Sequence, residues 1–371
     1  MRLPFNYRLN RNGRDATNDT PRGLRSTSAG RRNERRRVRR QGPARGGYHH
    51  ETYVFPLPDG SREVKCREPR EEILWFDRRC FLSEEELIRA LRGRVSRVPE
   101  IVDVAGIGLQ TFIEGWTLNA YSPSGVRVPE PLFGQIADLF PELMRITPDQ
   151  LGVERRCADR DRPDNGDSDG FLERLIAFME IQVYERNRED FEALFHELGV
   201  GADAFNRLRK CVLGLKERPF CLLHADLHRE NFIVDPHGQL WTIDWELAMF
   251  GDPLYDLATH LYLMRYPRDQ RKAMVAEWCA AAGESRRNLS YGWADDLPRI
   301  LDFKRAQSVF TDVIRVSLSL RQDGVFGWQA LPAAAVKIEK VLTAAAEPLG
   351  IEEVPGRQDI MTALARDLPS P

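Results

Sequence analysis

Apolar and polar positions alternate in short runs through the first third of the chain, with turn-forming residues between the runs. This pattern predicts half-buried strands at residues 36–40, 51–57, 62–67, 99–104 and 109–113. Pro58, Asp59 and Gly60 supply a hairpin turn between the second and third of these strands. Ser83 is followed by three glutamates and then by apolar Leu87, which predicts a capped helix. The first third should therefore form a small β-rich lobe with one main helix.

From residue 130 onward the apolar positions recur every three or four residues, which predicts helices. The predicted helical segments are residues 131–146, 170–198, 202–215 and, with breaks, 253 to about 347. Two short strands, 232–234 and 240–243, are expected around a turn at 235–238. An acidic loop is expected at 158–170, and the tail after residue 350 is weakly patterned. Strands followed by helices predict an α+β fold of two lobes, for which 371 residues are sufficient.

The composition, with 30% charged and 42% hydrophobic residues, is that of an ordinary globular protein. There is no run of 18 apolar residues, so no membrane span is predicted. The Arg-rich start also lacks the apolar segment of a secretory signal. The six cysteines are scattered without metal-ligand spacing, so reduced thiols and a cytoplasmic location are expected.

Residues 1–33 carry eight arginines against two aspartates and are mostly polar, so we expect a disordered basic tail. Such a tail can touch RNA, DNA or an acidic surface, which makes a nucleic-acid-binding protein one hypothesis. The rest of the chain shows no basic aromatic platform that would support it. A disordered, dispensable extension is the favoured interpretation of the tail.

Lysine is scarce in this chain, which has 47 arginines and seven lysines. The first 209 residues contain a single lysine, Lys65, on one of the predicted strands. Where arginine is the usual cation, a lone lysine suggests a position that needs a compact ammonium, such as a contact with phosphate. Chance is the alternative.

The densest chemical signal lies in residues 221–258. Asp226 follows an apolar run, Asn231 comes five residues later, and Asp244 thirteen residues after that at the end of a predicted strand. Phosphoryl transfer requires a carboxylate that accepts the proton of the attacking hydroxyl, and hard oxygen ligands for Mg²⁺. Singly, each residue reads as a turn or cap residue. Together and in this order, they predict a phosphoryl-transfer centre.

These residues resemble the motifs of the aminoglycoside phosphotransferase family, which has a bilobal fold like that of protein kinases. The family's H-G-D-x-H-x-x-N loop is similar to residues 224–231, with Ala225 in the place of glycine. The resemblance implies that Asp226 is the catalytic base and that Asn231 and Asp244 are Mg²⁺ ligands. Residues 243–246 resemble the family's I-D-W/F-E motif, which contains Asp244 here, and residues 251–258 resemble its G-D-P-x-x-D-L-A motif. The aspartates of the latter, Asp252 and Asp256 here, would brace the catalytic loop. For His224 and His228, loop-bracing hydrogen bonds are favoured over a zinc site.

The resemblance is looser in the first lobe. It implies that Gly46 and Gly47 form a phosphate-approaching turn between the first two strands. Lys65 would be the cation for the nucleotide phosphates, with Arg67 as a substitute. Its acidic partner would come from the helix after Ser83. The sequence does not choose among Glu84, Glu85 and Glu86, and Glu85, the middle one, is taken as the candidate. The segment around Thr111 and Ile113 would bind adenine and join the two lobes.

The expected division is therefore a tail at 1–33, a nucleotide-binding lobe at 34–114, a catalytic and acceptor-binding lobe at 115–349, and a tail at 350–371. The resemblance implies transfer of the γ-phosphoryl group of ATP, or alternatively GTP, with Mg²⁺, to a hydroxyl of an aminoglycoside-like antibiotic or metabolite. The acidic loop at 158–170 could attract a polycationic acceptor or serve only as a solvated linker. The alternative function is a catalytically silent nucleotide-binding protein of the same fold. No membrane or nucleic-acid partner is expected.

Overall fold

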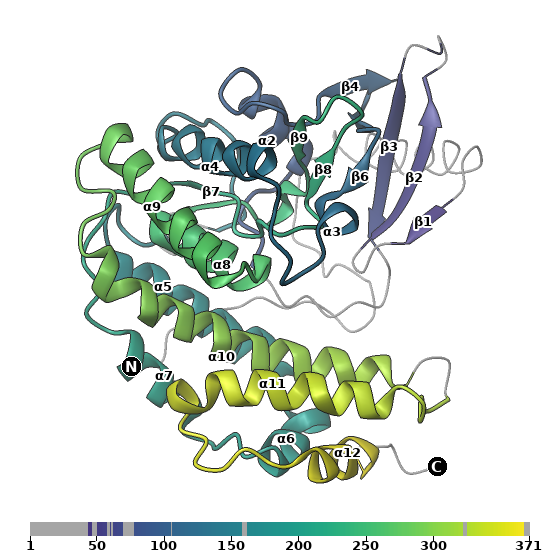
Figure 1. The fold of residues 1–371 in the computed structure, drawn as a ribbon, viewed down its shortest axis with the longest axis vertical. Coiled ribbons are helices and arrows are strands. Elements are labelled where there is room, and N and C mark those ends of the chain that lie inside the picture. The colour runs from purple at the N-terminus through teal and green to yellow at the C-terminus, as the bar shows by residue number, and fades with distance from the viewer. Residues whose placement is uncertain are drawn as a thin grey trace, which may run out of the picture.

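The structure is a computed structural model. It describes residues 44–46, 50–57, 60, 62–69, 78–104, 106–157, 162–321 and 325–366. The predicted α+β fold of two lobes is confirmed: the sheet of the small lobe lies at the upper right of Figure 1, and helices of the larger lobe lie to its left and below it. In this part of the chain, no helix has the length and apolar character needed to span a bilayer.

The small lobe is built on a five-stranded antiparallel sheet in the order β1-β2-β3-β5-β4. Alternating apolar residues bury one face of it, including Phe55, Val64 and Leu109. Helix α2 follows Ser83, whose hydroxyl accepts a hydrogen bond from the Glu86 N–H as an N-cap. The strands are β1 (Ala44–Gly46), β2 (His50–Pro56), β3 (Glu63–Pro69), β4 (Ile101–Val104) and β5 (Ile107–Thr111), and α2 spans Glu84–Leu91.

The two lobes are joined by a chain segment that pairs with the hairpin of β8 and β9. Strand β6 (Trp116–Thr117) pairs with β8 (Phe232–Val234), which pairs with β9 (Leu240–Thr242). Gly115, immediately before β6, has φ +149°, and a Cβ there would lie 2.2 Å from the Val234 carbonyl oxygen. Only glycine allows so close an approach of the two backbones. Helix α3 (Leu118–Tyr121) completes the connection.

The large lobe is mainly helical, and α10 and α11 run side by side through its lower half (Figure 1). Its short strands β7 (Cys221–Leu223) and β10 (Met249–Gly251) form an antiparallel pair beneath the catalytic loop. The helices are α4 (Glu130–Met144), α5 (Ser168–Phe178), α6 (Arg188–Glu197), α7 (Ala204–Val212), α8 (Pro253–Met264), α9 (Arg268–Ser285), α10 (Trp293–Ser319), α11 (Leu331–Leu349) and α12 (Arg357–Arg366).

Two expectations from the sequence need correction, and a third lies outside the described residues. The helix predicted over 170–198 is interrupted by a π-helical turn, Met179–Tyr184, and a 3₁₀ turn, Glu185–Asn187. The tail after residue 350, which is weakly patterned in sequence, contains helix α12, and three buried apolar residues of this helix pack it against the large lobe. The strand that pairs with β2 is Ala44–Gly46, whereas the predicted strand at 36–40 lies outside the described residues.

Candidate active site

The catalytic loop connects β7 to β8 and brings the predicted base and metal ligands together. The Asn231 amide nitrogen donates hydrogen bonds to the carbonyl oxygen and to Oδ2 of Asp226, both at 2.9 Å. The Ile243 N–H donates to the Asn231 carbonyl at 2.9 Å, which joins the loop to the segment ending in Asp244. The Asp226 side chain remains 26% exposed. The carboxylate is thus oriented by the protein and still reachable from solvent.

Asp244 lies two residues after β9 in a left-handed backbone conformation, φ +69° and ψ +65°, which aspartate adopts more readily than most residues. The 3₁₀ turn η5 (Trp245–Leu247) follows, and the Trp245 N–H donates to Glu84 Oε1 at 2.9 Å. Helix α2 of the small lobe is therefore bonded directly beside Asp244.

Asn231 and Asp244 also suit Mg²⁺ chemically. Both N–H bonds of the Asn231 amide nitrogen are directed at Asp226, so the amide oxygen is the atom of this side chain that can bind a metal ion. An amide oxygen and a carboxylate, completed by water and phosphate, are a set that Mg²⁺ accepts. Among the described residues, no cluster of three or more His, Cys, Asp or Glu side chains is arranged around a metal position.

His228 lies beside the predicted base. Its Nε2 is 3.3 Å from Asp226 Oδ2, and its Nδ1 accepts the Glu230 N–H at 3.1 Å. Nδ1 is an acceptor, so Nε2 carries the proton and donates to Asp226. Burial lowers the pKa of His228, but the hydrogen bond to Asp226 and the charges of Asp226 and Asp244 outweigh it and raise the pKa overall.

His224 braces the loop from the inside. It is fully buried, and its Nε2 is 3.1 Å from the Ile243 carbonyl oxygen. Burial lowers the pKa of His224 to about 4, so the ring is neutral at pH 7 and donates its Nε2 proton to that carbonyl. Its ring also packs on Trp245, with centroids 4.6 Å apart. The structure agrees with the predicted bracing role.

Asp256, on α8, holds the loop backbone. Its carboxylate accepts the N–H groups of His224 at 3.1 Å and Ala225 at 2.8 Å, which matches the bracing role predicted for it. Burial raises the pKa of Asp256 to about 6 against the opposing effect of these two bonds. Ala225 has φ +64°, so the methyl group in place of glycine costs roughly 1–2 kcal/mol of backbone strain.

Lys65 lies on β3 opposite Gln110 of β5 and is only 8% exposed. With Glu84 and Glu85 it lines a cavity of about 20 Å³, room for about one water molecule. Glu86, the third acidic candidate, is exposed and does not line this cavity. Of the three glutamates predicted as partners of Lys65, Glu84 and Glu85 are thus the two that share a cavity with it. Arg67 lies two residues further along β3.

The predicted adenine segment is only partly available for a ligand. The Thr111 hydroxyl accepts the Glu100 N–H at 3.0 Å, and the Thr111 N–H donates to the Glu100 carbonyl, so these groups join β5 to β4. Ile113 lines a cavity of about 1600 Å³ beside the segment that joins the lobes. Lys65 and Asp226 do not line this cavity. Gly46 is the last residue of β1 and pairs with Glu51, and Gly47, which follows it in the predicted turn, lies outside the described residues.

The acidic loop has local structural partners. Asp167 caps α5 by accepting the Gly170 N–H, and Asp169 accepts the backbone N–H groups of Gly214 and Leu215. These contacts favour the linker interpretation for both aspartates.

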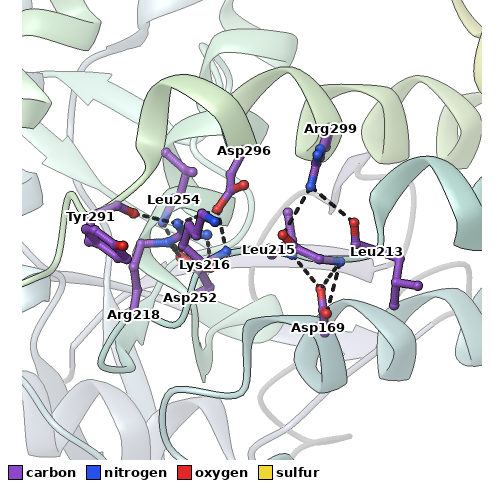
Figure 2. Close-up of polar contacts among 11 residues, drawn as sticks. Asp169, Leu213, Leu215, Lys216, Arg218, Asp252, Leu254, Tyr291, Asp296 and Arg299 are labelled. Carbon is purple, nitrogen blue, oxygen red and sulfur yellow. Dashed lines mark hydrogen bonds and ion pairs between the residues drawn. The ribbon is translucent and has the colours of Figure 1, made fainter.

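Sequence reasoning missed Arg218, which is fully buried next to the site. Its guanidinium lies between Asp252, which caps α8, and Asp296 of α10, with the nearest contacts at 2.7 Å to each (Figure 2). In a chain with 47 arginines, no local pattern distinguishes this one. Its only sequence signal is its place directly before the apolar run that enters β7.

Residues 41–294 match the model of a protein family described as "Phosphotransferase enzyme family". No curated protein matches the chain in sequence. Among solved structures, the gentamicin–APH(2")-IIa complex is similar at 16% identity and a TM-score of 0.49, covering 90% of this chain and 98% of that one.

Two further structures are similar in fold. A choline/ethanolamine kinase family protein from Mesorhizobium loti matches at 13% identity and a TM-score of 0.48, covering 91% of this chain and 99% of that one. The macrolide 2'-phosphotransferase MphH from Brachybacterium faecium matches at 15% identity and a TM-score of 0.43, covering 84% and 93%.

Proposed function

The chain belongs to the phosphotransferase enzyme family, and on that premise we propose that it moves the γ-phosphoryl group of ATP, with Mg²⁺, onto its acceptor. The protein is a small-molecule phosphotransferase that acts on hydroxyl groups. The donor nucleotide, the metal and the acceptor, an aminoglycoside-like antibiotic or a hydroxylated metabolite, are the proposed part. GTP is the alternative donor.

Asp226 is the proposed catalytic base, and the observation that carries the proposal is its double contact with Asn231. A carboxylate that is oriented yet reachable can accept the proton of an attacking hydroxyl as the new P–O bond forms. His228 donates to the same carboxylate and limits its rotation. Because the loop backbone is held by Asp256, the base does not have to be ordered when substrate arrives.

Lys65 is the proposed contact for the nucleotide phosphates, and Glu84 or Glu85 would hold its ammonium in place. A bound Mg²⁺, held by Asn231 and Asp244, would offset the negative charge of the phosphates. The hydrogen bond from Trp245 to Glu84 supports a coupling between the two sets of residues, because it joins α2 to the residue after Asp244.

The test incubates the protein with ATP or GTP, Mg²⁺ and a panel of aminoglycosides, choline-like alcohols and sugars. Phosphorylation is measured by the release of ADP or GDP and by the mass of the product. Asp226→Asn should lower kcat about 10²- to 10⁴-fold, because the proton acceptor is lost. Glu230→Gln, an exposed carboxylate in the same loop, is the matched control and should stay within threefold of wild type.

Activity of Asp226→Asn within threefold of the Glu230→Gln control would remove Asp226 as the base. Mg²⁺-dependent nucleotide binding without phosphorylation of any acceptor would instead support the catalytically silent alternative.

A further inference from the structure

The strand that enters the catalytic loop is preceded by an irregular segment, residues 213–218, whose backbone is held by side chains of two helices (Figure 2). Asp169 of α5 accepts hydrogen bonds from the N–H groups of Gly214 and Leu215, at 3.0 and 2.8 Å. Asp296 of α10 accepts a third backbone N–H of this segment at 2.8 Å. The segment is therefore fixed from both helices before it enters β7.

Arg218, the last charged residue before β7, has no exposed surface. Its Nε and Nη2 donate to the two carboxylate oxygens of Asp252 at 2.8 and 2.7 Å. Its Nη1 donates to Asp296 Oδ2 at 2.7 Å and to the Tyr291 carbonyl at 2.8 Å. The planar guanidinium can make this fork and bridge at the same time, which a lysine ammonium cannot.

Asp252 connects this ion-pair cluster to the active site. It is the N-cap of α8, and its Oδ1 also accepts the Leu254 N–H at 2.9 Å. One helical turn later, Asp256 holds the backbone N–H groups that immediately precede Asp226. The orientation of the first turn of α8 therefore fixes the position of the Asp256 carboxylate relative to the catalytic loop.

We propose that Arg218 is a positioning residue for phosphoryl transfer: by fixing the first turn of α8 through Asp252, it sets where Asp256 holds the catalytic loop and so where Asp226 points. This inference rests on the function proposed for Asp226. Lys65, the residue assigned to the nucleotide phosphates, lies on β3 of the other lobe, so the effect should fall mainly on kcat and little on nucleotide binding.

The experiment compares Arg218→Lys and Asp252→Asn with wild type in the full-length protein. The asparagine retains the cap to Leu254 through its amide oxygen and removes the charge. With the best acceptor, or Mg·ATP hydrolysis without acceptor, kcat should fall about 10- to 100-fold, since small misplacements of a reacting group have effects of this size. The KM for Mg·ATP should stay within twofold.

A second readout needs no turnover. Amide hydrogen exchange of the peptide covering residues 221–231 should accelerate at least tenfold in both variants, because its protected N–H groups depend on Asp256. Arg299→Ala, which removes contacts to the outer end of the 213–218 segment only, is the control and should change neither kcat nor this exchange by more than twofold.

Equal losses in Arg299→Ala and Asp252→Asn, or a kcat loss matched by an equal rise in KM, would overturn the positioning role. If Arg218→Lys does not fold, Asp252→Asn alone decides between these outcomes. If the wild-type protein turns over neither nucleotide nor acceptor, the proposed function fails. The hydrogen exchange rates still test the positioning of the loop by Arg218: faster exchange in the variants supports it, and unchanged exchange contradicts it.

Discussion

The two halves of the candidate site are held in different ways. In the large lobe, the catalytic loop is bonded to α8 through Asp256, to the end of β9 through Ile243, and within itself through Asn231. In the small lobe, Lys65 faces a small cavity with Glu84 and Glu85, and the linker lines a large one. The catalytic half is thus ordered by buried hydrogen bonds, whereas the nucleotide half leaves open space. Changes in the first half should alter kcat or stability, and changes in the second should alter nucleotide affinity.

The largest effect should come from the linker between the halves. Gly115→Ala should lower the free energy of unfolding by about 2–6 kcal/mol, because its Cβ would overlap the Val234 carbonyl and its φ is one that other residues rarely adopt. Gly125→Ala is the matched control, with φ +87° and no atom within 4 Å, and isolates the backbone strain. Urea unfolding measures both. Equal losses would show that the close approach to β8 is unimportant.

The buried histidine of the catalytic half predicts a pH dependence. The pKa of His224 is about 4 in the folded protein against 6.5 ordinarily, so the unfolded chain binds more protons between these values. The stability is therefore complete above pH 6.5 and falls by about 3 kcal/mol as the pH drops to 4. His224→Gln should remove this part of the acid dependence, whereas exposed His237→Gln should not. An unchanged acid slope in His224→Gln would contradict the assignment.

In the nucleotide half, Lys65→Met should weaken binding of Mg·ATP about 10- to 150-fold, as a charge-assisted hydrogen bond is worth about 1.5–3 kcal/mol. Calorimetric titration measures this directly. Lys210→Met, an exposed lysine on α7, is the control and should leave the affinity unchanged. If instead kcat fell and affinity did not, Lys65 would belong with the catalytic half.

The smallest effect should be a gain. Ala225→Gly should raise the free energy of unfolding by about 0.5–1 kcal/mol, because it relieves positive-φ strain partly offset by backbone entropy. Ala344→Gly, at an exposed position within α11, should lose about 1 kcal/mol instead. Thermal unfolding compares the two. A loss in Ala225→Gly would mean that the methyl group contributes packing that exceeds the strain.

The sequence alone was sufficient for the fold class and for the grouping of Asp226, Asn231 and Asp244. Asn231 contacts Asp226 within one loop, and the pairing of β8 with β9 brings the segment that ends in Asp244 back beside Asn231, where the Ile243 N–H bonds to the Asn231 carbonyl. The helix capped by Ser83 was predictable for the same local reason. The roles assigned to these residues remain predictions.

Only the tertiary structure decided which groups meet across long separations. Glu84 and Glu85 share a cavity with Lys65, whereas Glu86 is exposed and does not line it. The Thr111 hydroxyl bonds to the Glu100 backbone. The buried Arg218 guanidinium pairs with Asp252 and Asp296. These contacts depend on how the helices and the sheet pack. Arg218 lies 34 positions from Asp252 and 78 from Asp296, and no sequence pattern indicates pairs so far apart. The local chemistry of the site was therefore encoded by spacing, while its support was set by burial and packing.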